Sequence, residues 1–437
     1  MSETIQYIIR FLAGADIPEN ELQRIGYTSD VTEYPKYSIV IQPSDFFDAN
    51  VYGTKESLPS LPLKIWEEVP ILFGEPVIEK VDNTLVLKAD IVAGTYFLIS
   101  RYEEMIRKDV RDTHGRFPGK ESLPYRAGFI DRPIIEEWGT LFRQVLRDAG
   151  FTIPETEKKI QKIYLTHDVD QMAHFRNIRG MLGGFLRGIR WPKEGQKALR
   201  SFFGNLKYDP WYTFPFLYKL DTGLINVLGN ERCETISFFR AGGGKTREDK
   251  PVSNLLLPDY KTLINYTKRK NITIGLHSSY LAGKNPEVIK SEKQKLDKIT
   301  NKISTYNRHH FLGSREPGDM QALVDVGITD DFTMGYADMA GFRLGTCRPV
   351  KWINPETQKL SELLLHGLTI MDSSLSDKRY MYMNAHEAFH YCEQLINTVE
   401  GYNGELVLLW HNTSVEKRPD SYHRKLYRDI ILLLQKK

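Results

Sequence analysis

The stretch Ile163-Tyr-Leu-Thr-His-Asp-Val-Asp170 decides the fold, because it shows the pattern of an apolar strand that ends in polar residues. Two closely spaced carboxylates, Asp168 and Asp170, stand at that end. The first half of the stretch is rich in the β-branched and aromatic residues of a buried strand. Similar runs recur toward the C-terminus, and helical segments separate them. The expected strands are Ile163 to Thr166, Thr235 to Phe239, Ile272 to Leu276, His309 to Leu312, Thr369 to Met371 and Leu406 to Trp410. The expected helices are Asp259 to Lys270, Glu287 to Ser304, Asp319 to Val326 and Asn384 to Val399.

Strand followed by helix, repeated, predicts an α/β fold whose parallel sheet closes, or nearly closes, into a distorted β/α barrel. Chemistry in such folds lies at the carboxyl ends of the strands. Polar clusters stand at five of these ends: Thr166 to Asp170, His277 to Ser279, Arg308 to His310, Asp372 to Ser374 and His411 to Thr413. Any one of their histidines, taken alone, is more typical of a structural residue. Barrel geometry, however, would bring the whole set together.

A polar, proline-containing segment from Gly150 to Lys162 marks the expected domain boundary. Before it, Thr84 to Val92 alternates like a strand, and Ala93 to Lys108 and Pro133 to Asp148 have helical periodicity. The chain of 437 residues is also long for one core. We therefore expect a smaller α+β accessory domain over residues 1–155 and the β/α barrel over residues 156–437.

Charge and composition exclude several classes of function. The 59 basic and 56 acidic residues nearly balance, which argues against nucleic-acid binding by bulk charge. The three cysteines have no CxxC spacing, so neither disulfides nor a thiolate zinc site is indicated. Without a signal peptide or a long apolar run, the sequence predicts a cytoplasmic protein with no membrane span, and its oligomeric state stays undefined. The clearest basic bias, from Arg176 to Lys219, indicates either a solvated region or a surface for a polyanion or a membrane.

Asp168 and Asp170 are two residues apart, so a continuing strand would point both carboxylates to the same face, where they would repel each other. A divalent cation would resolve that conflict, with one aspartate as a ligand and the other as general base. Imidazole and carboxylate ligands with open positions suit Zn²⁺ or a related ion. The structural alternative is that both aspartates cap a following helix.

These residues resemble those of a known family. Leu165-Thr-His-Asp-Val-Asp170 resembles the first motif of the polysaccharide deacetylase family, also called carbohydrate esterase family 4. Ile274-Gly-Leu-His-Ser-Ser279 is similar to its second motif, and Leu406-Val-Leu-Leu-Trp-His411 is similar to its last. Arg308-His-His-Phe-Leu312 stands where an arginine motif is expected. The resemblance spans roughly residues 160–437, and it implies a zinc-dependent hydrolase that deacetylates an N-acetylated or O-acetylated carbohydrate.

The resemblance also implies a role for single residues. It makes Asp168 the general base, Asp170 and His277 metal ligands, Arg308 the residue that orients the base, and His411 the general acid. The sequence departs from the family at Leu281, where a second histidine ligand usually stands. Either the metal is held poorly or another residue is the third ligand. The candidates are His309 and His310, and His310 is preferred because it would alternate with Arg308 on one strand face.

The N-terminal region resembles the extra domain of a subgroup of deacetylase-like proteins. The motifs that carry this likeness are Ser100-Arg-Tyr-Glu-Glu104, His114-Gly-Arg-Phe-Pro118 and Gly341-Phe-Arg-Leu-Gly-Thr-Cys-Arg-Pro349. Within the last motif, Arg343 and Arg348 either bind an anionic substrate group or serve turn structure. His114 and Arg116 are candidates to cover the site from the N-terminal domain.

Two other functions compete with the deacetylase. The departure at Leu281 is compatible with a non-catalytic glycan-binding or scaffold protein that has lost tight metal binding. A third reading is an amidohydrolase of a small non-sugar amide, because one barrel supports many chemistries.

Overall fold

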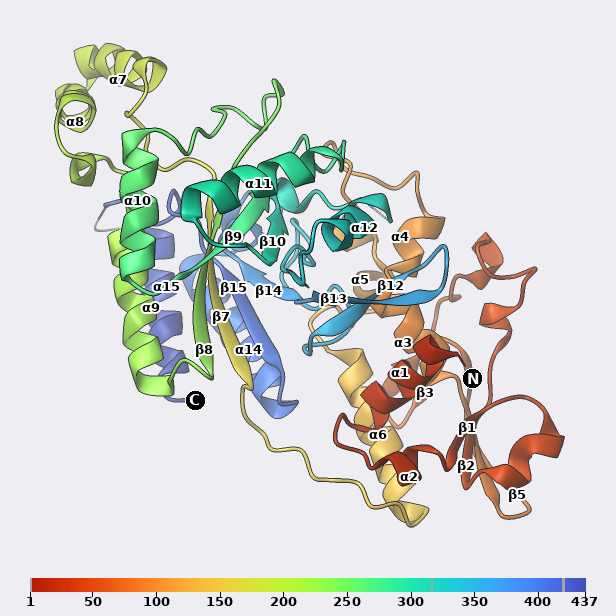
Figure 1. Ribbon diagram of the computed structural model, residues 1–437. Helices are drawn as coiled ribbons and strands as arrows, with labels where there is room; N and C mark the ends of the chain where they lie inside the picture. The colour runs from red at the N-terminus through yellow and green to blue at the C-terminus, as the bar shows by residue number, and fades with distance from the viewer. Residues whose placement is uncertain (1, 316, 419–420) are drawn as a thin grey trace.

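Two sheets organise the protein, whose structure is a computed structural model that describes residues 2–315, 317–418 and 421–437. The larger sheet has nine strands in the order β12-β13-β11-β10-β9-β8-β7-β15-β14. Neighbouring strands run parallel except for β12 and β13. Figure 1 shows the curl of this sheet, with helices around its outside. The result is a mixed α/β half-barrel.

The elements of the half-barrel alternate along the chain. Its strands are β7 (Lys162–Val169), β8 (Cys233–Phe239), β9 (Thr273–Ser278), β10 (Tyr306–His309), β11 (Asp330–Asp331), β12 (Val350–Asn354), β13 (Lys359–Leu365), β14 (Leu368–Met371) and β15 (Glu405–Leu409). Its helices are α7 (Ile178–Arg190), α8 (Pro192–Phe203), α9 (Phe214–Leu228), α10 (Pro258–Arg269), α11 (Val288–Thr300), α12 (Gly318–Asp325), α13 (Asp372–Ser376), α14 (Ala385–Gly401) and α15 (Tyr422–Leu434).

The two faces of β7 show how the sheet separates core from site. Because side chains alternate along a strand, Tyr164, Thr166 and Asp168 share the inner face. Tyr164 packs there in a small apolar cluster with residues such as Phe238 and Phe332, which fills the lower part of the half-barrel. His167 points the other way, where its Nε2 lies 2.9 Å from the Asp221 carboxylate of α9. The polar residues at the carboxyl ends of the strands therefore lie beyond this apolar packing. They form one rim of the half-barrel, called the upper rim here.

The N-terminal region has its own four-stranded sheet, in the order β1-β2-β6-β5. Its strands are β1 (Ile25–Tyr27), β2 (Ile39–Ile41), β5 (Gly74–Val81) and β6 (Thr84–Ala89), beside a separate hairpin of β3 (Lys64–Trp66) and β4 (Val69–Ile71). Its helices are α1 (Glu3–Ala13), α2 (Glu19–Leu22), α3 (Ile91–Ile99), α4 (Tyr102–Ile106), α5 (Leu123–Arg126) and α6 (Ile134–Asp148). This region packs directly against the half-barrel, as the hydrogen bond from Phe342 N–H to the Ile130 carbonyl illustrates.

Four sequence expectations differ, wholly or in part, from the structure. The barrel-like curl of the sheet is confirmed, but the sheet is not closed, since no pairing joins its edge strands β12 and β14 in the described ranges. The expected strand over His309 to Leu312 is wrong: β10 ends at His309, and the chain turns at Phe311, whose φ is +61°. The expected strand from Thr84 to Val92 also ends early, because Asp90 caps α3 by accepting the Ala93 N–H. The helix expected over Ala93 to Lys108 is two helices, α3 and α4, because the left-handed Arg101, whose φ is +56°, interrupts it. The other expected elements are present within a few residues.

None of the helices in the described ranges combines the length and the apolar character that crossing a bilayer requires.

A buried histidine joins opposite parts of the large sheet, and it leads to a prediction about pH. The two ring nitrogens of His366 lie 3.0 Å from Asp330 on β11 and 2.8 Å from Glu405 on β15. Burial lowers the pKa of His366, but these two carboxylates outweigh burial and raise it from 6.5 to about 9. A raised folded-state pKa stabilises the fold fully below pH 6.5, and this stabilisation is lost as pH rises through 9.

We expect the free energy of unfolding of the wild-type protein, relative to His366→Gln, to fall by about 3 kcal/mol between pH 6 and pH 10. Urea unfolding of both proteins across that range measures the difference. His390→Gln is the matched control, because its ring is half exposed on α14. A difference between wild type and His366→Gln that does not change with pH would contradict the prediction.

Candidate metal centre

The end of β7 supplies two carboxylates to the upper rim of the half-barrel. The chain stays extended to Val169, so Asp168 and the following Asp170 both face inward. Asp168 is almost fully buried, whereas the Asp170 side chain is about 28% exposed. The two acids therefore lie one behind the other, with Asp170 nearer to solvent.

His277 comes from β9 and points at Asp170. Its Nδ1 lies 2.8 Å from the Arg308 carbonyl oxygen, which can only accept a hydrogen bond, so Nδ1 carries the ring proton. In the neutral ring, Nε2 then presents a lone pair to the Asp170 Oδ1, 3.0 Å away. A lone pair and a carboxylate oxygen at this distance repel unless a proton or a cation lies between them. A carbonyl-bound Nδ1–H with a free Nε2 is the arrangement of most metal-binding histidines.

His310 approaches the same carboxylate from the turn after β10. Its Nε2 lies 3.3 Å from Asp170 Oδ1, and its Nδ1 lies 3.3 Å from the Arg240 guanidinium Nη1 and 3.6 Å from Asp249 Oδ1. Asp249 is itself held by backbone N–H groups of Gly244, Tyr280 and Leu281. Arg240 and Asp249, which lie 3.9 Å apart, thus both stand behind the His310 ring, while its Nε2 faces Asp170.

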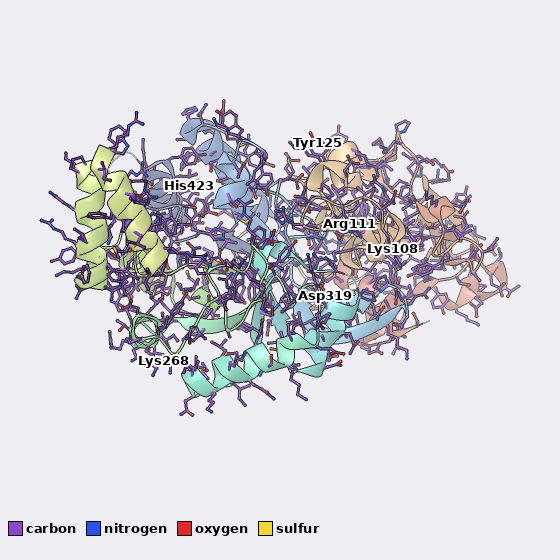
Figure 2. All side chains as sticks on the ribbon, turned by 90° about the horizontal axis from the view of Figure 1, so that it is seen from above. Lys108, Arg111, Tyr125, Lys268, Asp319 and His423 are labelled. Carbon is purple, nitrogen blue, oxygen red and sulfur yellow. The ribbon has the colours of Figure 1, made fainter. Side chains whose placement is uncertain are left out.

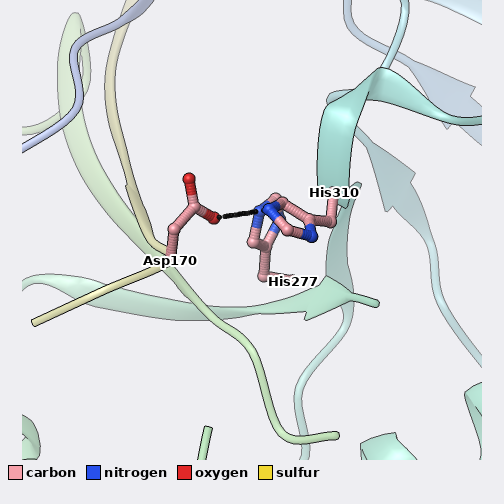
Figure 3. A group of neighbouring side chains, drawn as sticks. All are labelled: Asp170, His277 and His310. Carbon is pink, nitrogen blue, oxygen red and sulfur yellow. Dashed lines mark hydrogen bonds and ion pairs between the residues drawn. The ribbon is translucent and has the colours of Figure 1, made fainter. Parts of the chain in front are cut away.

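Asp170, His277 and His310 together form a group that fits a divalent cation (Figure 3). One ligand atom from each residue lies within 4.8 Å of the other two. Two imidazole nitrogens and one carboxylate oxygen are a donor set typical of zinc and related ions, and three protein ligands leave a position open. Without a cation, a proton on His277 Nε2 would relieve the conflict with Asp170, and burial, which lowers the pKa of His277, is outweighed by Asp168 and Asp170, which raise it. The donor set and its convergence are therefore the structural reason to place a cation here.

Arg308 holds Asp168 beside this group. The Arg308 side chain is fully buried, and its Nη1 donates to Asp168 Oδ1 at 3.1 Å and to Thr166 Oγ1 at 2.6 Å. Its Nε donates to the Phe332 carbonyl, so the guanidinium cannot swing away. The second oxygen of Asp168 stays directed at the centre, 3.7 Å from His277 Nε2.

His411 faces the centre from the segment after β15. Its Nδ1 lies 2.8 Å from Asp372 Oδ1, and Asp372 also accepts the His411 backbone N–H. The opposite ring nitrogen, Nε2, lies 3.7 Å from Asp170 Oδ2. The ring is thus oriented from behind with its free nitrogen toward the cleft.

The histidines and aspartates of the site shift one another's pKa values toward the charged forms. Burial would raise the pKa of Asp170, but the imidazoles of His310, His277 and His411 hold it well below its usual value. Burial lowers the pKa of His411, but Asp372 first, and then Asp170 and Asp168, raise it to about 10. Without a cation, His411 is therefore protonated at neutral pH. A bound cation would offset the carboxylates and lower this pKa.

The centre lies in a cleft of about 180 Å³. Its walls include Asp168, Asp170, His277, His310 and His411, together with Phe311, Met371, Arg379 and Tyr380. Arg116, from the N-terminal region, also lines the cleft. It is held by Asp112 and donates to the Phe311 carbonyl and the Tyr380 hydroxyl. The N-terminal region thus forms part of the wall.

Other candidates from the sequence lie elsewhere. Arg343 is buried and forms a bidentate pair with Glu104, and Arg348 pairs with Glu136. Both arginines join the N-terminal region to the half-barrel and neither lines the cleft, so turn and interface structure accounts for them. His309 faces away from the cleft and hydrogen-bonds Asn307, and burial lowers its pKa to about 3.

Two acids near the centre were assigned no chemical role from the sequence, although Asp372 belonged to one of the five strand-end clusters. Its position at a strand end was the available signal. Asp249 lies in the loop between β8 and α10, and nothing in its local sequence indicates its contact with His310. Its partner residue Leu281 occupies the position where the family usually has a histidine.

Fold and site together define a mixed α/β protein with a curled half-barrel sheet and a candidate divalent-metal centre at its strand ends. Residues 2–150 match the model of a family of unknown function, DUF7033. No curated protein matches the sequence.

Two solved structures resemble the chain distantly. One is described provisionally as a polysaccharide deacetylase from Mycobacterium smegmatis, with 12% identity, a TM-score of 0.40, and coverage of 65% of this chain and 86% of that one. The other is an allantoinase, with 12% identity, a TM-score of 0.38, and coverage of 66% and 89%.

Proposed function

We propose that the protein is a metal-dependent hydrolase, with zinc as its metal, that removes an acetyl group from the nitrogen or oxygen of a carbohydrate. The observation that carries the proposal is the paired arrangement around Asp170. The imidazoles of His277 and His310 converge on this carboxylate, the buried carboxylate of Asp168 lies behind it, and the His411 ring faces it from the other side.

Each residue has a task in this reaction. A divalent cation held by Asp170, His277 and His310 would supply Lewis-acid chemistry that polarises an acyl carbonyl and acidifies water. Asp168 accepts the proton that the attacking water loses, while Arg308 keeps its carboxylate oriented. His411 donates a proton from Nε2 to the leaving nitrogen or oxygen. A bond forms between the acyl carbon and the water oxygen, and the bond from the acyl carbon to the sugar nitrogen or oxygen breaks. The products are acetate and the free amine or alcohol.

The substrate class rests on two supports. The sequence motifs resemble those of carbohydrate deacetylases, and the cleft of about 180 Å³ is smaller than an ordinary drug-sized pocket. A cleft of this size suits a small acyl group with part of the attached ring. Arg116 would then help to shape the substrate position from the N-terminal region.

Metal binding is the first test. We expect the protein to bind one equivalent of zinc by elemental analysis, and we expect Asp170→Ala and His277→Ala each to weaken binding more than about 100-fold, because each removes one of three ligands. His167→Ala is the matched control, since this histidine pairs with Asp221 on the opposite face of the same strand. Chelation should abolish acetate release from a panel of N-acetylglucosamine, its β-1,4-linked dimer, acetylated xylose and 4-nitrophenyl acetate, and zinc should restore it.

The outcomes separate the competing functions. Absence of stoichiometric metal would reject the hydrolase and favour a glycan-binding scaffold. Metal binding with hydrolysis of small non-sugar amides alone would reject the carbohydrate substrate and keep the metal-dependent mechanism.

A further inference from the structure

A helical hairpin stands off the half-barrel at one end of the molecule. It consists of α7 and α8, which are joined at Trp191 (Figure 1). Figure 2, viewed from above, shows the same pair at the edge of the molecule. The hairpin lies within the basic stretch of the sequence, and the proposed hydrolase reaction uses none of its residues.

The two helices meet through small residues. A Cβ atom added at Gly188 would lie 2.6 Å from the Cα of Gly195, and one added at Gly184 would lie 2.6 Å from the Ala198 Cβ. Contacts this short show that the helices approach too closely for larger side chains between them. The bulky residues of the hairpin must therefore face outward.

An apolar stripe runs along the outer face of α7. Its members follow the spacing i, i+4, i+7, i+8 and i+11, which places them on one side of a helix. They are Ile178, Leu182, Phe185, Leu186 and Ile189, and their exposed fractions are 66%, 49%, 51%, 63% and 78%. Trp191 at the turn and Phe203 at the end of α8 are 61% and 75% exposed. Apolar side chains gathered this way in water mark an interaction surface.

Cationic residues accompany the stripe. The hairpin contains six of them, Arg179, Arg187, Arg190, Lys193, Lys197 and Arg200, and a single acid, Glu194. At 3.6 residues per turn, the three arginines of α7 lie on the flank next to the apolar stripe. Glu194 is already paired with Lys197. The surface that the hairpin offers is thus apolar with a strongly positive border.

The base of the hairpin is fixed to the body of the protein. Buried Asp209 accepts the backbone N–H groups of His174 and Phe175 and the Ser201 hydroxyl, so it holds both ends of the hairpin. Arg176 forms a bidentate pair with Asp259 of α10. These contacts hold the hairpin in a set direction, whereas the stripe itself stays uncovered.

We propose that the α7–α8 hairpin binds the surface of anionic lipid bilayers. The apolar stripe enters the boundary between headgroups and acyl chains, and the cationic border pairs with lipid phosphates. At 13 and 12 residues the helices are too short to span the hydrocarbon core, so the hairpin lies in the interface. The positive border selects an anionic membrane over a neutral one, and charge complementarity is the reason to prefer a bilayer to a second copy of the chain.

Vesicle flotation with the full chain tests this proposal. We expect the protein to float with vesicles of phosphatidylcholine and phosphatidylglycerol, to bind pure phosphatidylcholine weakly, and to dissociate as salt rises. The double variants Phe185→Glu/Ile189→Glu and Arg187→Glu/Arg190→Glu should each reduce the partition coefficient at least about tenfold. The matched control is Val31→Glu/Ile303→Glu, which places the same charges on apolar residues that are 61% and 73% exposed outside the hairpin.

Circular dichroism melting of each variant shows whether it is folded. Three outcomes would overturn the proposal: no flotation with anionic vesicles, equal loss of binding in the control, or lipid-free dimerisation that Phe185→Glu/Ile189→Glu abolishes. The last result would show that a second copy of the chain covers the stripe. Flotation needs no catalytic readout, so its result is independent of the hydrolase assignment.

Discussion

Replacing Asp168 with asparagine is expected to slow acetate release about 10²–10⁴-fold while the zinc content stays unchanged. Asparagine has the same shape as aspartate, but its amide cannot take a proton from water. An amide oxygen at this position can still accept the Arg308 N–H that Asp168 accepts at 3.1 Å, so the ligand group should keep its position in the folded protein. The lost charge beside the buried Arg308 lowers stability, so turnover is referred to the folded fraction. Steady-state kinetics on the best substrate of the acetylated panel, with elemental analysis of the same samples, measures both quantities.

Asp221→Asn is the matched control, because it makes the same chemical change in another buried aspartate, on the far side of β7. Asp221 contacts His167 and Tyr427 and does not reach the cleft. We expect the turnover number of Asp221→Asn, calculated for the folded protein, to lie within a few-fold of the wild-type value. Two results would show that Asp168 is not the base: full turnover in Asp168→Asn, or equal losses in both variants.

The second large effect is on stability, at the contact between the N-terminal region and the half-barrel. Arg343 Nε and Nη2 donate to the two Glu104 oxygens at 3.0 and 2.8 Å, and both side chains are nearly fully buried. Glu104→Ala would leave the Arg343 charge buried without its carboxylate partner. We expect the free energy of unfolding to fall by about 3–5 kcal/mol, measured by urea unfolding.

Two comparisons define the cause of that loss. Glu362→Ala removes the surface pair with Lys351, where Glu362 is 86% exposed, and it should cost less than about 1 kcal/mol. The double variant Glu104→Met/Arg343→Met should recover part of the stability, because the Arg343 charge is removed with its partner, whereas the buried Arg101, 3.8 Å from Glu104, keeps its charge. A Glu104→Ala variant as stable as Glu362→Ala would mean that this pair does not hold the two regions together.

Local patterns were sufficient to predict most of the half-barrel. Runs such as Leu406 to Trp410 are apolar on both faces, which is typical of a buried parallel strand, and this one matches β15 closely. The strand expected over His309 to Leu312 failed because a sequence of aromatic and imidazole residues resembles a strand. Phe311 instead turns the chain with a positive φ. The reason for preferring His310 was thus wrong, although its side chain does lie beside Asp170 and His277.

Several contacts depend on packing between distant segments. Asp249 reaches His310 across 61 positions of chain, and Asp372 reaches His411 across 39. Neither pair has a fixed spacing that a sequence pattern could reveal. Arg343 illustrates the opposite case, since a conspicuous arginine in a glycine-rich motif proves to be the partner of Glu104.

By itself, the sequence determined the alternation of strands and helices and the side chains that each strand carries to its end. Both follow from short-range rules: the period of apolar residues and the alternation of faces along β7. Only the tertiary structure decided which carboxylate stands behind which imidazole, that the sheet stays open, and that the α7 stripe lies exposed among the residues that the structure describes. Those outcomes depend on distances between residues far apart in the chain, and packing of the whole molecule sets them.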